Sequence, residues 1–250
     1  MTFKTKTKDL IVLTLLRKIR RSLIHSNSTK KYLLYAIGEI ALVVIGILIA
    51  LQINNWNEEQ KDRQFERNIL SEFREDLVLD TLWFQGRLDR IDGIIEALEK
   101  LESMPEWSDS MYLWLDLAGD EIYMQVNTGS LETLKSVGMN YIRNDELRRY
   151  IVRFYQRAEM NLDVINQMGR DVDDQWKIFT KDHFLLERVQ TELGVGRRVP
   201  INYKDLKTNP KYQQILVYKM LSLESRGERI KRHKMGARSL IAAIDEYLLE

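Results

Sequence analysis

The sequence predicts an all-α protein, in which a single transmembrane helix is followed by an elongated helical bundle with long antiparallel helices. Three observations indicate this fold class. Residues 33–53 form an uninterrupted apolar run. Two later stretches, 55–103 and 210–249, repeat apolar residues every seven positions, as helices that pack along their length do. The chain also has only three prolines in 250 residues, so few points force a helix to end.

The apolar run is long enough to cross a bilayer. At about 1.5 Å per residue, the helix would measure roughly 31 Å, and a hydrocarbon core is about 30 Å thick. Glu39 is its only charge, and it lacks the polar stripe of a soluble core helix. A cleaved signal peptide is the alternative, but the run is too long and no small-residue cleavage pattern follows it. We therefore expect a segment at 1–31, an uncleaved span at 32–54 and a helical domain at 55–250.

The distribution of charge predicts the orientation of this span. Nine basic residues and one acid precede the run, whereas the residues after it are net acidic. Because basic residues remain on the cytoplasmic side, we expect the protein in the inner (plasma) membrane of a bacterium, with a cytoplasmic N-terminus and a periplasmic C-terminal domain. Residues 9–24 are either a basic amphipathic helix on an anionic leaflet or a charged tail that only fixes topology.

Glu39 is an expensive group to place inside a span. It shares a helix face with Gly46, and Ala50 follows Gly46 at small-xxx-small spacing. This face predicts a contact between transmembrane helices, across which a protonated Glu39 donates a hydrogen bond. The alternatives are that Glu39 reaches the cytoplasmic interface without a partner, or that it couples protons to a motor-like partner. Trp56 lies just past the run and suits an interfacial anchor.

Two segments resemble a known family. The string YAIGEIALVVIGILIALQINNWNE, within residues 32–58, is similar to the hallmark of an uncharacterised bacterial family of single-span membrane proteins, domain of unknown function 6090. Residues 131–155 are similar to a second segment of that family, in which an L-K-S-x-G turn precedes an I-x-N-D-x-L-R helix start. The resemblance implies a membrane-anchored helical protein, and it brings no catalytic residues with it.

The external domain is expected to fold as an up-down bundle of four helices, in which the first and last are the longest and lie antiparallel. Pro105 ends the first helix, Gly138 ends a short one, and Asn144 caps the next. We expect residues 190–210 to be the least ordered part. The predicted helices span 55–103, part of 107–124, 131–137, 144 to about 167 or on through 179, and about 210–249.

The search for chemistry finds no catalytic motif, no cofactor motif and no metal site. The chain has no cysteine, which excludes disulfides, thiolate chemistry and cysteine metal sites. His183 and His233 have no second histidine at metal-binding spacing. Asp171, Asp173 and Asp174 lack the glycine turn and spacing of a calcium loop, so we expect these three acids on a solvated helix face. The net acidic external domain argues against nucleic-acid or phosphate binding. Six aromatic residues are expected in the core, or in part around a ligand cleft: Trp83, Trp107, Trp114, Tyr123, Tyr155 and Trp176.

These observations favour a non-enzymatic envelope protein that mediates assembly, either as a homo-oligomer or with another membrane protein. The second hypothesis is a sensory or small-ligand-binding bundle that signals through a partner. The third, an enzyme, requires His183, His233 and Asp173 or Asp174 to converge on a metal. Whether the bundle closes within one chain or is completed by a second chain remains open, because both arrangements bury the same heptad seams.

Overall fold

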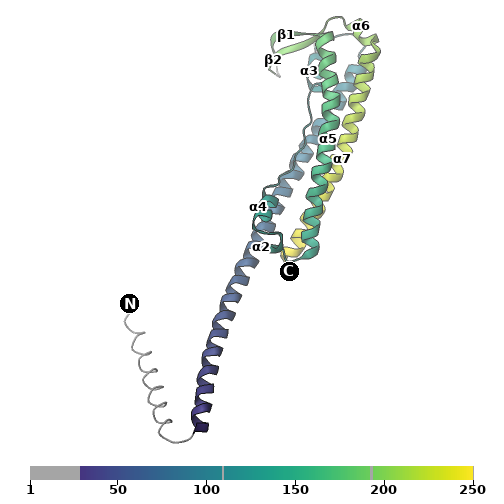
Figure 1. The fold of residues 1–250 in the computed structure, drawn as a ribbon. Coiled ribbons are helices and arrows are strands. Elements are labelled where there is room, and N and C mark those ends of the chain that lie inside the picture. Colours follow the sequence, from purple (N-terminus) through teal and green to yellow (C-terminus); the bar gives the residue numbers. More distant parts are fainter. Residues whose placement is uncertain (1–28, 109, 192–193, 250) are drawn as a thin grey trace. The chain divides into compact units, whose positions relative to one another are not determined.

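The computed structural model describes residues 29–108, 110–191 and 194–249 and is nearly all-α (Figure 1). The predicted amphipathic segment at 9–24 lies outside these residues. The chain divides into two units, residues 1–63 and 64–250. Helix α2 (Thr29–Ser103) begins in the first unit and continues into the second. Its apolar stretch is long and apolar enough to cross a membrane, and within that stretch no side chain is buried by the rest of the chain.

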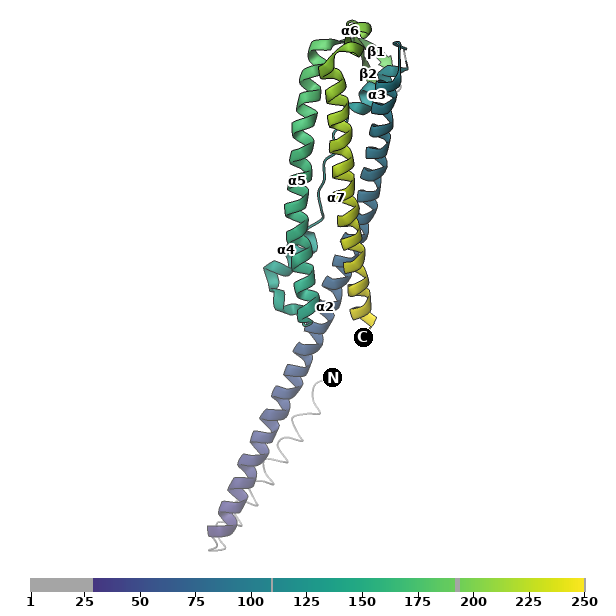
Figure 2. The same cartoon turned by 90° about the vertical axis from the view of Figure 1, so that its right-hand side faces the viewer.

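Three long helices run side by side in the second unit (Figure 2): the later part of α2, α5 (Asp145–His183) and α7 (Pro210–Leu249). Arg74 of α2 lies 2.5 Å from Asp245 of α7, whereas Gly227 of α7 lies beside Ile91 of α2, so these helices are antiparallel. The predicted heptad seams are confirmed, because all their members are buried. They are Leu70, Leu77, Phe84, Ile91 and Leu98 on α2, and Leu216, Leu223, Ile230, Ala237 and Ile244 on α7.

Where the expected up-down bundle of four would have its second helix, the described bundle has two short helices joined by an extended segment. Residues 119–128, here called the strap, connect α3 (Met111–Ala118) to α4 (Gly129–Val137). Asp120 pairs with Arg90 and Asn127 pairs with Asp80, so the strap runs antiparallel to α2. It carries the chain back before α5 begins. As a result α2 and α5 are parallel, as the first and third helices of the expected up-down order of four are.

The strap obtains hydrogen bonds from side chains, because an extended segment beside helices has no neighbouring strand. The buried Asn166 of α5 accepts from the Met124 N–H and donates to the Met124 carbonyl, both at 2.8 Å. At the far end, both carboxylate oxygens of Asp80 accept from the Asn127 N–H, at 3.1 and 3.2 Å. Met124 and Ile122 meanwhile place their side chains in the core.

Residues 190–210 are more regular than expected. The strands β1 (Phe184–Thr191) and β2 (Gly194–Pro200) form an antiparallel hairpin with an irregularity between Glu187 and Gln190. The short helix α6 (Tyr203–Thr208) follows, capped by Asn202. The described residues of this range therefore form regular elements that the sequence did not predict. Cross-strand pairing and the Arg197–Glu187 ion pair stabilise the hairpin, and neither can be recognised from local composition.

Replacing Asn166 with alanine is expected to destabilise the protein. The change leaves the buried N–H and carbonyl of Met124 without partners, which costs about 2–4 kcal/mol. Chemical unfolding of the full-length protein in detergent measures this loss as a lower denaturant midpoint at constant slope. Gln167→Ala is the matched control, because Gln167 is exposed and adjacent on α5. Equal midpoints for the two variants would contradict the role assigned to Asn166.

Candidate functional site

The residues predicted to form a contact between transmembrane helices lie on one face of α2. With 100° per residue, Glu39, Gly46 and Ala50 fall within an arc of about 40°. All three are exposed, and a Cβ added at Gly46 would meet no atom within 4 Å. Trp56 lies three residues beyond the apolar run and is 61% exposed. The chain therefore covers none of these four residues with its own described atoms.

A buried group of charges lies between α5 and α7. Lys219 is completely buried and donates a 2.7 Å hydrogen bond to Asp173, which is 4% exposed. Burial lowers the pKa of Lys219, and Asp173 partly offsets this. The Lys219 ammonium also lies 5.5 Å from the centre of the Trp176 ring. Asp173 is thus a core residue, and the expectation that it belongs to a solvated helix face was wrong; Asp171 and Asp174 are exposed, as expected.

Arg226 carries a second positive charge into the same core. It is completely buried, and none of its three guanidinium nitrogens has a hydrogen-bond partner among the described residues. Burial lowers its pKa, while Asp173 raises it. Gly169 makes room for this side chain, because a Cβ there would lie 2.2 Å from an Arg226 nitrogen. The packing of α7 against α5 therefore depends on a glycine that the sequence did not mark as special.

Two carboxylates of α2 hold the start of α4. Asp76 accepts from the Asn127 side chain at 2.6 Å and from both the N–H and the hydroxyl of Ser130. Asp80 is 6% exposed, and burial raises its pKa to about 7 although the Asn127 N–H opposes this. The nearby Asp76 charge adds to the shift. The pair anchors the strap rather than facing an open space where a substrate would bind.

The second resemblance segment consists of residues that shape the turn between α4 and α5. Gly138 ends α4 at φ 123°, a conformation that favours glycine. Ile142 is completely buried. Asn144 caps α5 by accepting from the N–H groups of Glu146 and Leu147, as predicted. Arg148 donates to the Ile142 carbonyl at 2.8 Å. The motif therefore specifies a connection, and its residues are used for folding.

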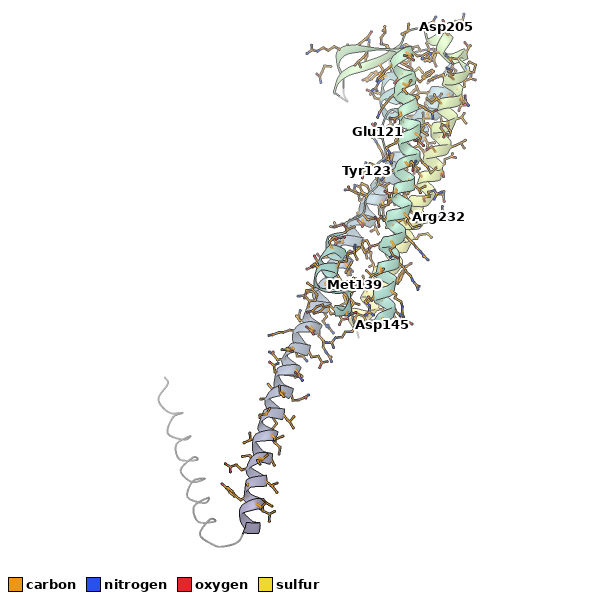
Figure 3. The ribbon with its side chains drawn as sticks, in the orientation of Figure 1. Glu121, Tyr123, Met139, Asp145, Asp205 and Arg232 are labelled. Atoms are coloured by element: carbon orange, nitrogen blue, oxygen red, sulfur yellow. The ribbon has the colours of Figure 1, made fainter. Side chains whose placement is uncertain are left out.

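An open groove between α5 and α7 gathers five arginines that form no ion pair with described residues. Its volume is about 910 Å³, and Phe154 and His233 form its buried part. Figure 3 shows one of its members, Arg232, on α7. This groove was not predicted, although arginines at 149, 153 and 157 recur every fourth residue and so share a face of α5. The residues that line this arginine groove are Glu146, Arg149, Tyr150, Arg153, Phe154, Arg157, Asn161, Arg229, Arg232, His233 and Gly236.

The histidines and acids named for a metal site do not converge. His183 stacks on Phe179 and places one ring nitrogen 2.9 Å from the Phe179 carbonyl, at the end of α5 where α7 begins. His233 lies between Phe84 and Phe154, 23 residues after the start of α7, or about 35 Å along that helix. Within the described ranges, no three metal-binding side chains group together. Among the six named aromatics, Tyr155 and Trp176 are buried, but Tyr123 is 58% exposed and is no core residue.

The family model of a family of unknown function, DUF6090, matches residues 39–174, more than half of the chain. The chain belongs to this family. The DUF6090 match includes Glu39, Gly46, Ala50 and Trp56, the strap and the α4–α5 turn, and it ends within α5. No curated protein matches the chain, and no solved structure matches it.

Asp173→Ala is expected to destabilise the bundle strongly, because it leaves Lys219 buried without its partner. Breaking a buried ion pair on one side costs about 3–5 kcal/mol. The neighbouring Asp174→Ala removes only an exposed ion pair with Lys177 and should cost less than about 1 kcal/mol. Denaturant midpoints of the two full-length variants compare them. Similar losses at both positions would contradict the structural role given to the buried pair.

His233 should make the protein sensitive to acid. Burial lowers its pKa from 6.5 to about 4, so the unfolded chain binds a proton between these values that the folded chain does not. Stability from this group is complete above pH 6.5 and is lost as the pH falls to 4, by about 3 kcal/mol. His233→Phe keeps a ring between Phe84 and Phe154 without a titrating group. Unfolding midpoints at pH 7 and pH 4.5 should therefore differ less in this variant than in the wild type.

Proposed function

We propose that this DUF6090 protein is a non-enzymatic, membrane-anchored envelope protein that assembles with itself or with another membrane protein through its apolar helix. The observation that carries this proposal is the exposed face of α2 with Glu39, Gly46 and Ala50 on one line. Small residues let a second helix approach closely, and a protonated carboxyl inside a bilayer gains most from a partner across the contact. The proposed location is a bacterial inner membrane, with residues 1–31 cytoplasmic and the bundle periplasmic.

The buried heptad seams support different roles for the two units, folding for one and assembly for the other. Residues 64–250 bury the apolar repeats of α2 and α7 against each other, so that unit does not require a second chain to cover them. The apolar side chains of residues 33–53 remain exposed instead. Assembly is therefore proposed for the span, and the heptad seams are assigned to folding.

A sensory or ligand-binding bundle is the second candidate. The observation that favours it is the arginine groove, which lies in the unit proposed to be periplasmic. This candidate also requires a partner that receives a signal through the span. Cross-linking in native membranes, followed by identification of the bound proteins, separates the two hypotheses. Only a sensor should show cross-links that change when a small ligand is added.

Gly46→Leu and Glu39→Ala should each weaken self-association or partner capture in membranes. Leucine at position 46 keeps helix backbones apart, and alanine at position 39 cannot donate a hydrogen bond across the contact. Förster transfer between labelled chains in lipid vesicles measures the effect, with an expected loss of about 1–2 kcal/mol for each change. Gly38→Leu is the matched control, because Gly38 lies about 100° away from this face and is equally open. If Gly38→Leu and Gly46→Leu behave alike, the proposed face is wrong.

A further inference from the structure

The residues that line the arginine groove carry an excess of positive charge. Five arginines line it, against one acid, Glu146. Elsewhere in the bundle several arginines are paired, as Arg74 is with Asp245 and Arg198 is with Asp116. In the described parts of the chain, the five groove arginines take part in no ion pair. Only Arg232 among them has a hydrogen bond, a 3.4 Å contact from its Nε to the Glu228 carbonyl.

This arrangement is unfavourable for folding by itself. Arg149, Arg153 and Arg157 follow one another at four-residue spacing on α5, and like charges at that spacing repel. Arg229 and Arg232 of α7 add their charges from the facing helix of the same groove. A concave surface lined by one sign of charge concentrates the field and attracts a counter-ion. The repulsion would be relieved by a bound anion.

Two buried polar atoms in the groove also have no partner. The Nε of Arg229 and the Nε2 of His233 are inaccessible to solvent and form no hydrogen bond with described atoms. His233 is 7% exposed and stacks on Phe154, with the ring centres 4.9 Å apart. Unsatisfied buried polar groups are rare in native proteins and often mark a missing ion, water or ligand. Because both atoms are shielded from solvent, a ligand in the open groove does not reach them without a side-chain movement, and the inference rests on the charges of the lining arginines.

We propose that the arginine groove binds a phosphate-bearing anion. Guanidinium groups form paired hydrogen bonds with phosphate oxygens. The five guanidinium groups of the groove carry more hydrogen-bond donors than a single carboxylate can accept. A volume of about 910 Å³ admits more than one phosphoryl group and lies within the range of ligand pockets. The net acidic charge of the whole domain argued against phosphate, but that average conceals the local excess. This inference does not depend on the proposed assembly through the span.

The first experiment measures pyrophosphate binding to the full-length protein in neutral phosphatidylcholine nanodiscs by titration calorimetry. Arg153→Gln combined with Arg229→Gln should weaken binding by about tenfold or more, because each lost charged hydrogen bond counts separately. Arg170→Gln with Arg238→Gln is the matched control, since both residues are exposed, lie on the same two helices and are outside the groove. Equal weakening in the two double variants would overturn the proposal.

A second arm identifies the source of the phosphate. Phenylglyoxal modification of Arg153 and Arg229 is followed by mass spectrometry, with pyrophosphate in neutral nanodiscs or with nanodiscs that contain phosphatidylglycerol. Protection by pyrophosphate indicates a soluble ligand, and protection only by phosphatidylglycerol indicates a lipid headgroup. Protection by neither overturns the proposal.

A charge-keeping variant separates binding from folding. Arg153→Lys with Arg229→Lys retains both charges but loses the planar fork, so its affinity should fall between those of the wild type and the glutamine variant. The ligand-free unfolding temperature of the glutamine variant should not fall, because the change removes repulsion and no ion pair. A lysine variant that binds no better than the glutamine variant, together with a lowered unfolding temperature in both, would show that the arginines act in folding and would overturn the proposal.

Discussion

The extended strap is the constraint on which the rest of the bundle depends. A chain that ascends in α2 must return before α5 can ascend beside it, and residues 119–128 make that return without helical hydrogen bonds. Extended backbone between helices is stable only where side chains provide donors and acceptors. Asn166 does this in the middle, and the Asp76 and Asp80 carboxylates do it at the end. The parallel arrangement of α2 and α5 follows directly from these few contacts.

The buried charges between α5 and α7 select one register of these helices more clearly than they stabilise the fold. Taking Lys219 and Asp173 out of water costs several kcal/mol, and their mutual attraction returns this only where the geometry is good. Arg226 increases the cost, since its guanidinium has no partner in the described core. An apolar seam alone would tolerate a shift of one helix along the other. A shift of one turn would separate Lys219 from Asp173 and move Arg226 away from Gly169, so the polar groups select one register.

Much of this fold was predictable because it depends on local pattern. The heptads placed the α2 and α7 seams, Asn144 marked the start of α5, and Gly138 marked the end of α4. The strap was not predictable, because its partners lie 30 or more residues away in sequence and its composition resembles any loop. Asp173 was misread for a related reason. Its neighbours Asp171 and Asp174 are exposed, and only the position of Lys219 on a distant helix shows that the middle acid is buried.

The extent of the DUF6090 match separates two kinds of feature. The strap network lies wholly inside residues 39–174, since Asp76, Asp80 and Asn166 all belong to the matched region. The buried ion pair and the arginine groove each take one wall from inside the match and the other from α7, which lies beyond it. The return of the chain along α2 is therefore encoded within the matched segment. The buried ion pair and the arginine groove also need side chains from α7. They therefore form only in a chain that includes α7.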